Sequence, residues 1–255
     1  MFVPAMKPLI LLTNDDGYFA DGIQALARKL KAAAETVIVA PDREKSATSL
    51  SLTLRRPLRV ERIKKDIFAV DGTPADCIYL ALKMILPRTP DLVLSGINRG
   101  PNLGQQDISY SGTVAAAIQG TFLKIPSVAL SAVLGGPDLE APAGFARRLA
   151  ERLLRRGLPP GLTLNINFPA PPIKGVRITK LGEKRYDPEI VEKRDPRDNT
   201  YYWIGSGVPT PIGDRASDVW AVSHGYVSVT PLHTDLTDYA ALERPGWRRL
   251  FQDLL

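Results

Sequence analysis

The sequence predicts an α/β protein with a mostly parallel sheet at its centre. Two patterns lead to this prediction. Short apolar runs rich in β-branched residues alternate with longer segments whose apolar residues recur about every 3.6 positions. The short runs lack polar alternation, which is typical of parallel strands buried on both faces. With 255 residues, of which 44% are hydrophobic and 24% charged, the chain can form one large domain or a domain with an appendage.

The expected strands and helices follow one another in βαβ order. Strands are expected at residues 9–13, 36–40, 91–95, 127–131 and 162–168. Helices are expected at residues 22–34, 74–86, 112–124 and 144–157. Residues 55–70 instead alternate with a period of two around a Lys-Lys-Asp break, which predicts a hairpin at an edge of the sheet.

The character of the sequence changes after the last of these strands. Residues 170–218 are rich in proline, glycine, charged and aromatic residues, whereas a strand is expected again at 224–232 and a helix at 245–255. We therefore expect an extension that contains a β-hairpin arm, a strand returning to the core and a terminal helix. The two parts are a core over residues 1–169 and a C-terminal extension over residues 170–255.

The composition excludes several kinds of site. Cys77 is the only cysteine, so no intramolecular disulfide can form, and two histidines cannot build a histidine-rich or cysteine-rich zinc site. Any metal must therefore bind mainly to oxygen. The formal charge of +6 would attract anionic substrates. Because the apolar run at the N-terminus is too short for a signal peptide or a membrane span, we expect a cytoplasmic protein with no membrane partner.

The strongest chemical feature is the sequence Thr-Asn-Asp-Asp-Gly-Tyr directly after the first expected strand. Ligands of open parallel sheets collect outside the carboxyl ends of the strands. The adjacent carboxylates of Asp15 and Asp16 repel each other there, and a bound Mg²⁺ or Mn²⁺ would remove the repulsion. An Asx-turn or a helix N-cap formed by Asp16 or Asp21 explains the pair equally well.

Other expected strand ends carry small polar side chains as well. Ser46 follows the strand at 36–40, and Asn98 and Asn102 follow the strand at 91–95. At the carboxyl ends of successive strands, these groups resemble an oxygen-ligand metal site more than a set of independent turns.

A second feature is the start of the alanine-rich helix at 112–124. Ser111, Gly112 and Thr113 offer hydroxyl groups and free backbone N–H groups, which together suit a phosphate. A serine or threonine N-cap without any ligand is the commoner meaning of such a sequence. We favour phosphate because this helix follows the loop that contains Asn98 and Asn102.

The chain contains the runs LLTNDDG, APDREKSA, VDGTPADC, SGIN with GPNLG, YSGTVAAA and GYVSVTPL. In this order these motifs, which span roughly residues 8–240, closely resemble the SurE family of stationary-phase survival phosphatases. The resemblance implies a Rossmann-like three-layer α/β/α catalytic core, one divalent cation per subunit, with Mg²⁺ or Mn²⁺ favoured, and 5'-nucleotidase activity. It also implies a homodimer or homotetramer with an exchanged C-terminal element.

The resemblance also implies roles for single residues. Its motifs assign the metal to Asp15, Asp16, Ser46 and Asn98. They assign phosphate to Ser111, Gly112 and Thr113, to which we add Asn102 from the preceding loop. The catalytic groups are then Asp15, Asp16 and Asn98, and Asp15 either activates a water molecule or attacks the phosphorus itself.

The expected reaction is hydrolysis of nucleoside 5'-monophosphates, with other phosphomonoesters, 3'-nucleotides and short polyphosphate as further substrates. A non-catalytic nucleotide-binding module is the rival class, although a pure phosphate binder gains nothing from two uncompensated carboxylates. The chain lacks the Asp-x-Asp spacing of haloacid dehalogenase phosphatases and the glycine-rich loop of Walker-type NTPases. We expect no stable nucleic-acid complex.

Several other residues have simpler explanations. Cys77 is expected to be buried, and His224 and His233 to be surface or hydrogen-bonded residues. The arginines and lysines of residues 55–70 are expected to form a solvated edge. The aromatic residues 201–203 are expected to pack an arm against a partner rather than to stack on a base.

Overall fold

The computed structural model describes residues 7–133, 139–187, 189–205, 207, 210–244, 246 and 249–251. Nine strands form its central sheet: β1 Leu9–Thr13, β2 Glu35–Pro41, β3 Val60–Lys64, β4 Ile67–Val70, β5 Leu92–Arg99, β6 Ser127–Ala132, β7 Leu162–Phe168, β8 Gly175–Ile178 and β13 Tyr226–His233. Their order is β3-β4-β2-β1-β5-β6-β7-β13-β8. Neighbouring strands from β4 to β7 are parallel, while β3 pairs antiparallel to β4 and β13 pairs antiparallel to β7.

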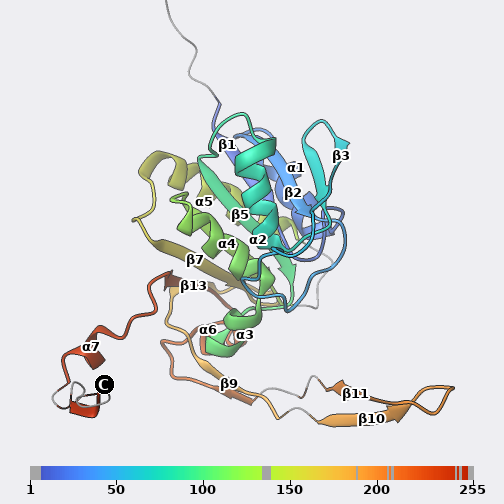
Figure 1. Cartoon of the computed structure of the whole chain (residues 1–255). Coiled ribbons are helices and arrows are strands. Elements are labelled where there is room, and N and C mark those ends of the chain that lie inside the picture. The colour runs from blue at the N-terminus through green and yellow to red at the C-terminus, as the bar shows by residue number, and fades with distance from the viewer. Residues whose placement is uncertain are drawn as a thin grey trace, which may run out of the picture.

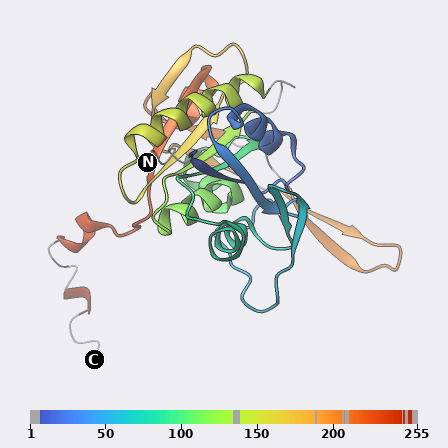
Figure 2. The same ribbon diagram turned by 90° about the horizontal axis from the view of Figure 1, so that it is seen from above.

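Helices cover both faces of this sheet, which confirms the expected three-layer α/β/α fold. They are α1 Asp21–Leu30, α2 Pro74–Leu80, the π-helical turn η1 Ala81–Ile85, α3 Gly104–Tyr110, α4 Gly112–Phe122, α5 Glu140–Arg156, α6 Asp218–Ser223, α7 Tyr239–Leu242 and the 3-10 turn η2 Arg249–Phe251. Helices α1 and α5 lie on one face, and α2 and α4 on the other (Figures 1 and 2). No helix among the described residues combines the length and the apolarity needed to cross a bilayer.

A hydrophobic core fills each of the two interfaces between sheet and helices. Strand residues alternate between them, so that Ile10 packs toward α1 while Leu9 and Leu11 pack toward α2. Cys77 lies in the second core, and burial raises the pKa of its thiol well above the ordinary value. The expected structural role of this cysteine is confirmed, because a buried and protonated thiol is a poor nucleophile.

Strand β5 is the main departure from the expected elements. It continues to Arg99 instead of ending at Ser95, so Asn98 lies near the end of a strand and not in a loop. Both edges of β5 are paired as far as Ser95, and beyond a register shift only β6 pairs with Asn98 and Arg99. Gly96 permits this shift, because its φ is +127° and a Cβ atom would lie 2.2 Å from the carbonyl oxygen of Leu130. The apolar run that predicts a strand ends at this glycine, whereas the strand itself continues to Arg99.

The helices also differ from the expectation at several ends. Helix α1 stops at Leu30, four residues early, and α5 begins at Glu140, four residues before the expected start. The short helices α3 and α6 were not expected at all. Each has only six or seven residues, too few to establish a helical period in the sequence.

The C-terminal extension contains the expected arm and the returning strand. Strand β9 (Glu183–Arg185) pairs with β12 (Thr210–Ile212), and β10 (Ile190–Arg194) pairs with β11 (Thr200–Ile204). The β10–β11 hairpin points away from the core (Figure 1). Because β8 and β13 join the central sheet, the proposed boundary at residue 169 runs through one sheet and stays a prediction. The expected helix at 245–255 lies largely outside the described residues.

A buried carboxylate fixes α6 beneath the sheet. Asp218 is fully buried and accepts backbone N–H groups from Gly104 at 2.9 Å, Gly182 at 2.8 Å and Val219 at 2.7 Å. The first two donors belong to α3 and to the segment before β9. One side chain of α6 therefore binds both the beginning of α3 and the segment before β9.

We predict that Asp218→Ala lowers the free energy of unfolding by roughly 3 kcal/mol or more, because three buried N–H groups lose their acceptor. Urea denaturation followed by circular dichroism measures this change. Asp214→Ala is the control, since Asp214 is exposed and should hardly move the denaturation midpoint. Equal midpoints for the two variants would contradict the proposed role of Asp218.

Candidate active site

Asp15 is held against the beginning of α4. The carboxylate lies directly after β1 and is only 4% exposed. One of its oxygens accepts the hydroxyl hydrogen of Thr113, and the backbone N–H groups of Gly112 and Thr113 also point to this carboxylate. A Cβ atom on residue 112 would lie 2.8 Å from the Cβ of Asp15. Only glycine permits so close an approach of the helix to the carboxylate.

Asp16 is half-buried beside Asp15 and receives the backbone N–H of Arg99 at the end of β5. Burial, followed by the charge of Asp15, raises the pKa of Asp16 to about 6, and Glu44 acts in the same direction. Burial also raises the pKa of Asp15, although the Thr113 hydroxyl and the backbone N–H groups of α4 oppose this effect. Both acids are therefore costly to ionise in the protein alone.

Asn98 and Ser46 lie on the two segments that adjoin the aspartates. Asn98 precedes the residue whose backbone binds Asp16, and its side-chain nitrogen donates to the carbonyl of Gly100 at 2.8 Å. This bond uses only the side-chain nitrogen and leaves the amide oxygen of Asn98 available to bind a cation. The loop with Ser46 is joined to the site because the Lys45 backbone N–H donates to the carbonyl oxygen of Asp15 at 2.7 Å.

The hydroxyl of Ser46 itself is exposed and donates to Glu44 at 2.8 Å. The structure thus brings Asp15, Asp16 and the end of β5 together and places Ser46 on an attached loop. Binding of one ion by Asp15, Asp16, Ser46 and Asn98 stays a prediction.

The groups expected to bind phosphate at α4 already form hydrogen bonds within the protein. The Ser111 hydroxyl oxygen accepts the backbone N–H of Val114 at 3.1 Å, so Ser111 is the N-cap of the helix. The N–H groups of Gly112 and Thr113 are directed at Asp15. Phosphate binding by these residues stays a prediction, which requires an anion to share the helix terminus with a carboxylate.

Asn102 lies in a separate polar network. Its backbone N–H donates to the side chain of Asn167 and its side-chain nitrogen to Ser131, both at 2.8 Å. Its carbonyl oxygen accepts the side-chain N–H groups of Asn165 and Asn167. These bonds fix the segment between β5 and α3 on the sheet, and within the part of the chain that the structure describes no hydrogen bond joins Asn102 to the aspartates. Its role in phosphate binding stays a prediction.

The alternative turn interpretation applies to Asn14 and not to the aspartates. The Asn14 side chain donates to the carbonyl of Gly17 at 2.9 Å and accepts the N–H of Gly17 at 3.2 Å. The N-cap of α1 is Ala20, which has no side-chain capping bond, and Asp21 forms an ion pair with Arg99. The carboxylate of Asp16 is therefore not used in capping α1.

The donor set at this site fits a hard divalent cation. Within the described ranges, no group of three or more histidine, cysteine, aspartate or glutamate side chains is arranged to hold a metal. An ion here would combine two carboxylates with neutral oxygens such as the Asn98 amide oxygen, as Mg²⁺ and Mn²⁺ accept. Bound charge would also relieve the conditions that raise both aspartate pKa values.

Sequence reasoning missed three contributors to this site. The backbone N–H of Arg99 binds Asp16, the backbone N–H of Lys45 binds the carbonyl of Asp15, and Glu44 adds negative charge. Arg99 follows Asn98 directly, Lys45 precedes Ser46 directly, and Glu44 lies two residues before Ser46. Adjacency in the sequence was the available signal, but it cannot tell which backbone groups turn toward the acids.

Comparisons with known proteins agree on one family. Residues 10–188 match the model of the family described as survival protein SurE. A 5'-nucleotidase SurE of Geobacter sulfurreducens is 49% identical over 238 residues, 91% of this chain and 90% of that protein. One from Geotalea uraniireducens is 50% identical over 244 residues, 92% and 98% of the two chains. The crystal structure of the SurE protein from Aquifex aeolicus has a TM-score of 0.81 and 43% identity, and the match covers 95% of this chain and all of that one.

The raised pKa of Asp16 leads to a prediction about stability in the presence of a chelator. Because the folded protein binds this proton more tightly than the unfolded chain, stability is lost as the pH rises through about 6. Asp16→Asn, whose amide oxygen can still accept the Arg99 N–H, should melt at a higher temperature than the unchanged protein at about pH 8. The difference should vanish near pH 4.

Asp42→Asn is the matched control with the opposite sign. Arg43 holds the pKa of Asp42 below its ordinary value, so removing this charge should lower the melting temperature at about pH 8. Differential scanning calorimetry across this pH range measures both effects. A lower melting temperature for Asp16→Asn at about pH 8 would show that Asp16 is not destabilising.

Proposed function

Because the chain belongs to the survival protein SurE family, we propose that it hydrolyses nucleoside 5'-monophosphates with the help of one divalent cation, Mg²⁺ or Mn²⁺. It is a phosphoric monoester hydrolase, as its relatives named 5'-nucleotidase indicate. The observation that carries the finer proposal is the pair Asp15 and Asp16. These acids lie at the carboxyl ends of the parallel strands, where burial raises both pKa values.

The cation would be held by Asp15, Asp16, Ser46 and Asn98. When bound, it would neutralise negative charge on the phosphoryl group, which is the main difficulty in phosphate ester hydrolysis. Asp16 is oriented for this role by the Arg99 backbone N–H, and Asp15 by the Thr113 hydroxyl.

Asp15 has two possible chemical roles. One carboxylate oxygen is bound by Thr113, which fixes the direction in which the other oxygen points. That oxygen can accept a proton from an attacking water molecule, or it can attack the phosphorus and form an aspartyl-phosphate. Both roles use the ionised carboxylate, which a bound cation would favour.

The phosphoryl oxygens would be bound at the beginning of α4. The Ser111 hydroxyl hydrogen remains free to donate after the oxygen has capped the helix. The Gly112 and Thr113 N–H groups add the partial positive charge of the helix terminus, and Asn102 would donate from the neighbouring loop. A substrate held here would have its phosphorus close to Asp15, as an in-line reaction requires.

The remaining proposals concern substrates and assembly. Other phosphomonoesters, 3'-nucleotides and short polyphosphate carry the same reacting group and are proposed as further substrates. We propose a cytoplasmic homodimer or homotetramer with an exchanged C-terminal element. The projecting β10–β11 hairpin supports this, because Tyr202, Trp203 and Ile204 are more than 60% exposed.

The activity proposal predicts the behaviour of two substitutions. Asp15→Asn and Asp16→Asn should each lower kcat for AMP at least about a hundredfold, since each removes charge at the reacting group while preserving shape. Release of inorganic phosphate measures the rate, and circular dichroism confirms folding. Asp42→Asn should retain activity. Near-normal turnover by a folded Asp15→Asn or Asp16→Asn protein would refute the proposed site.

Metal binding has a test that does not depend on activity. Saturating Mn²⁺ should raise the melting temperature of the unchanged protein. At a free Mn²⁺ concentration of a hundred times Kd, the free energy of unfolding should rise by about 2.7 kcal/mol. Asp16→Asn should lose most of this shift, while Asp42→Asn should keep it. The same shift in Asp16→Asn would place the ion elsewhere on the protein, and EDTA should reverse every specific shift.

A further inference from the structure

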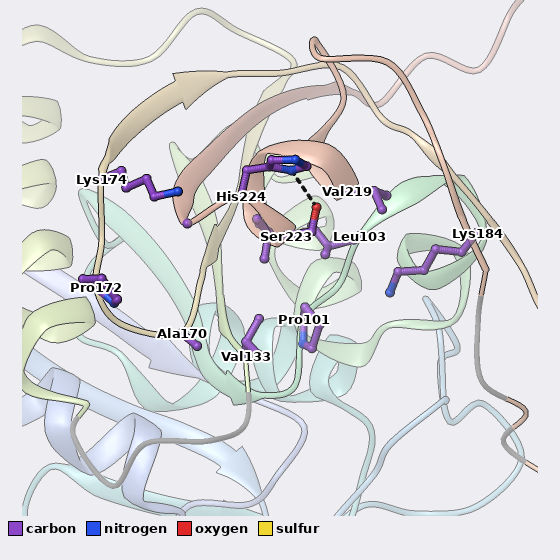
Figure 3. A pocket seen from close by; sticks show the side chains of 12 residues that line it. Pro101, Leu103, Val133, Ala170, Pro172, Lys174, Lys184, Val219, Ser223 and His224 are labelled. Carbon is purple, nitrogen blue, oxygen red and sulfur yellow. Dashed lines mark hydrogen bonds between the residues drawn. The ribbon is translucent and has the colours of Figure 1, made fainter.

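A cavity of about 480 Å³ lies beside the loops that follow β5, β6 and β7 (Figure 3). Its walls are mainly apolar, with side chains from the three loops and from α6. Leu103, Val133 and Val219 are among them, and Lys174 and His224 lie at its border. This size and this mixture of apolar walls with a few polar groups are typical of small-molecule sites.

The walls of the cavity are held by the polar networks described above. Asn102 fixes the loop after β5 to the sheet through Ser131 and Asn167. Asp218 fixes α6 to the backbone of Gly104 and Gly182. The cavity is therefore formed before any ligand enters, which lowers the entropic cost of binding.

The cavity and the candidate active site share one edge of the sheet. The aspartates follow β1, and the cavity lies at the carboxyl ends of β5, β6 and β7, which are the next strands in order. With neighbouring strands about 4.8 Å apart, β6 and β7 lie roughly 10 to 14 Å from β1. A nucleotide is elongated, with its phosphate at one end and its base at the other, and can span such a distance.

We propose that this cavity binds the nucleoside part of the substrate, with the base between the apolar side chains and His224. The proposal rests on the function proposed above. The His224 ring is stacked on Trp220 with ring centroids 3.9 Å apart, and Nδ1 lies 2.8 Å from the carbonyl oxygen of Trp220. These contacts orient the imidazole and leave Nε2 for the ligand.

The charges around the cavity favour a base over a second phosphate. Lys184 is nearly buried and forms an ion pair with Asp107, so its charge is already compensated. Lys174 is exposed and forms no ion pair with any of the described residues. A single exposed lysine beside apolar walls is weak for a dianion, whereas a flat heteroaromatic ring gains from apolar contact and from stacking.

Two variants test the cavity without touching the aspartates or α4. Ser223→Trp should fill the space from an exposed position on α6, and His224→Ala should remove the stacking partner. We expect each to raise KM for AMP about tenfold. For ribose 5-phosphate, which has the same sugar and phosphate but no base, KM should change less than about twofold. Asp42→Asn, which lies outside the cavity, is the control and should leave both values unchanged.

Equal effects on the two substrates would overturn the proposal, because the cavity would then act on the phosphate site in general. The absence of any effect on either substrate would overturn it as well. The split between KM and kcat adds a further criterion, since loss of base binding should leave kcat for ribose 5-phosphate unchanged.

A binding experiment separates this proposal from the activity itself. In a Trp203→Phe, Trp247→Phe background, Trp220 is the only tryptophan left, and adenosine in the cavity should change its fluorescence. With EDTA present, adenosine should still bind. The Ser223→Trp variant contains a second tryptophan, so its loss of adenosine binding should be measured by calorimetry instead of fluorescence. If adenosine binds but the protein releases no phosphate from AMP when Mg²⁺ or Mn²⁺ is present, the proposed nucleotidase activity is rejected and the proposed binding cavity is retained. A lack of adenosine binding in an active enzyme would reject the cavity alone.

Discussion

The site depends on the close contact between a buried carboxylate and the first turn of a helix. Asp15 reaches α4 because residue 112 has no side chain, and the Thr113 hydroxyl and two N–H groups offset part of the cost of burying the charge. The offset is incomplete, since the pKa of Asp15 is still raised. The ionised form of this carboxylate is therefore costly without a further positive charge, which supports the proposed cation site.

The sequence predicts the core of this fold well and its connections poorly. Buried parallel strands are continuous apolar runs, so β1, β2, β6 and β7 lie within a residue or two of their expected positions. Strand β5 was expected to end at Ser95, since the glycine after it resembles a terminator. It continues because β6 still pairs with Asn98 and Arg99, beyond the end of the pairing with β1, and a register shift absorbs the irregularity. Such tertiary support is not visible in local sequence.

At the candidate site, too, the local sequence predicts some contacts, whereas others depend on how the strands and loops pack. The acids and the beginning of α4 were expected as neighbours because both lie at the carboxyl edge of the sheet, and the structure joins Asp15 to Thr113. Asn102 was expected at this site from its place in the loop. In the structure its bonds go to Ser131 and Asn167, which lie on β6 and β7, and its role in phosphate binding stays a prediction. A polar residue inside an apolar strand, such as Asn167, is the sequence feature that marks a buried partner of this kind.

The segment from Asn98 to Gly104 links the two ends of the proposed substrate site. Its first residues adjoin Asp16, its middle is bound to β7, and its last residue donates to Asp218 on α6. Because this segment is attached at three points, it holds the acids and the cavity at a distance that the fold determines. The distance between phosphate and base in a nucleotide is limited by its own covalent structure. In the proposed site, this segment would therefore set the spacing between phosphate and base. The apolar walls would accept many bases, because they contain few groups that could distinguish one base edge from another.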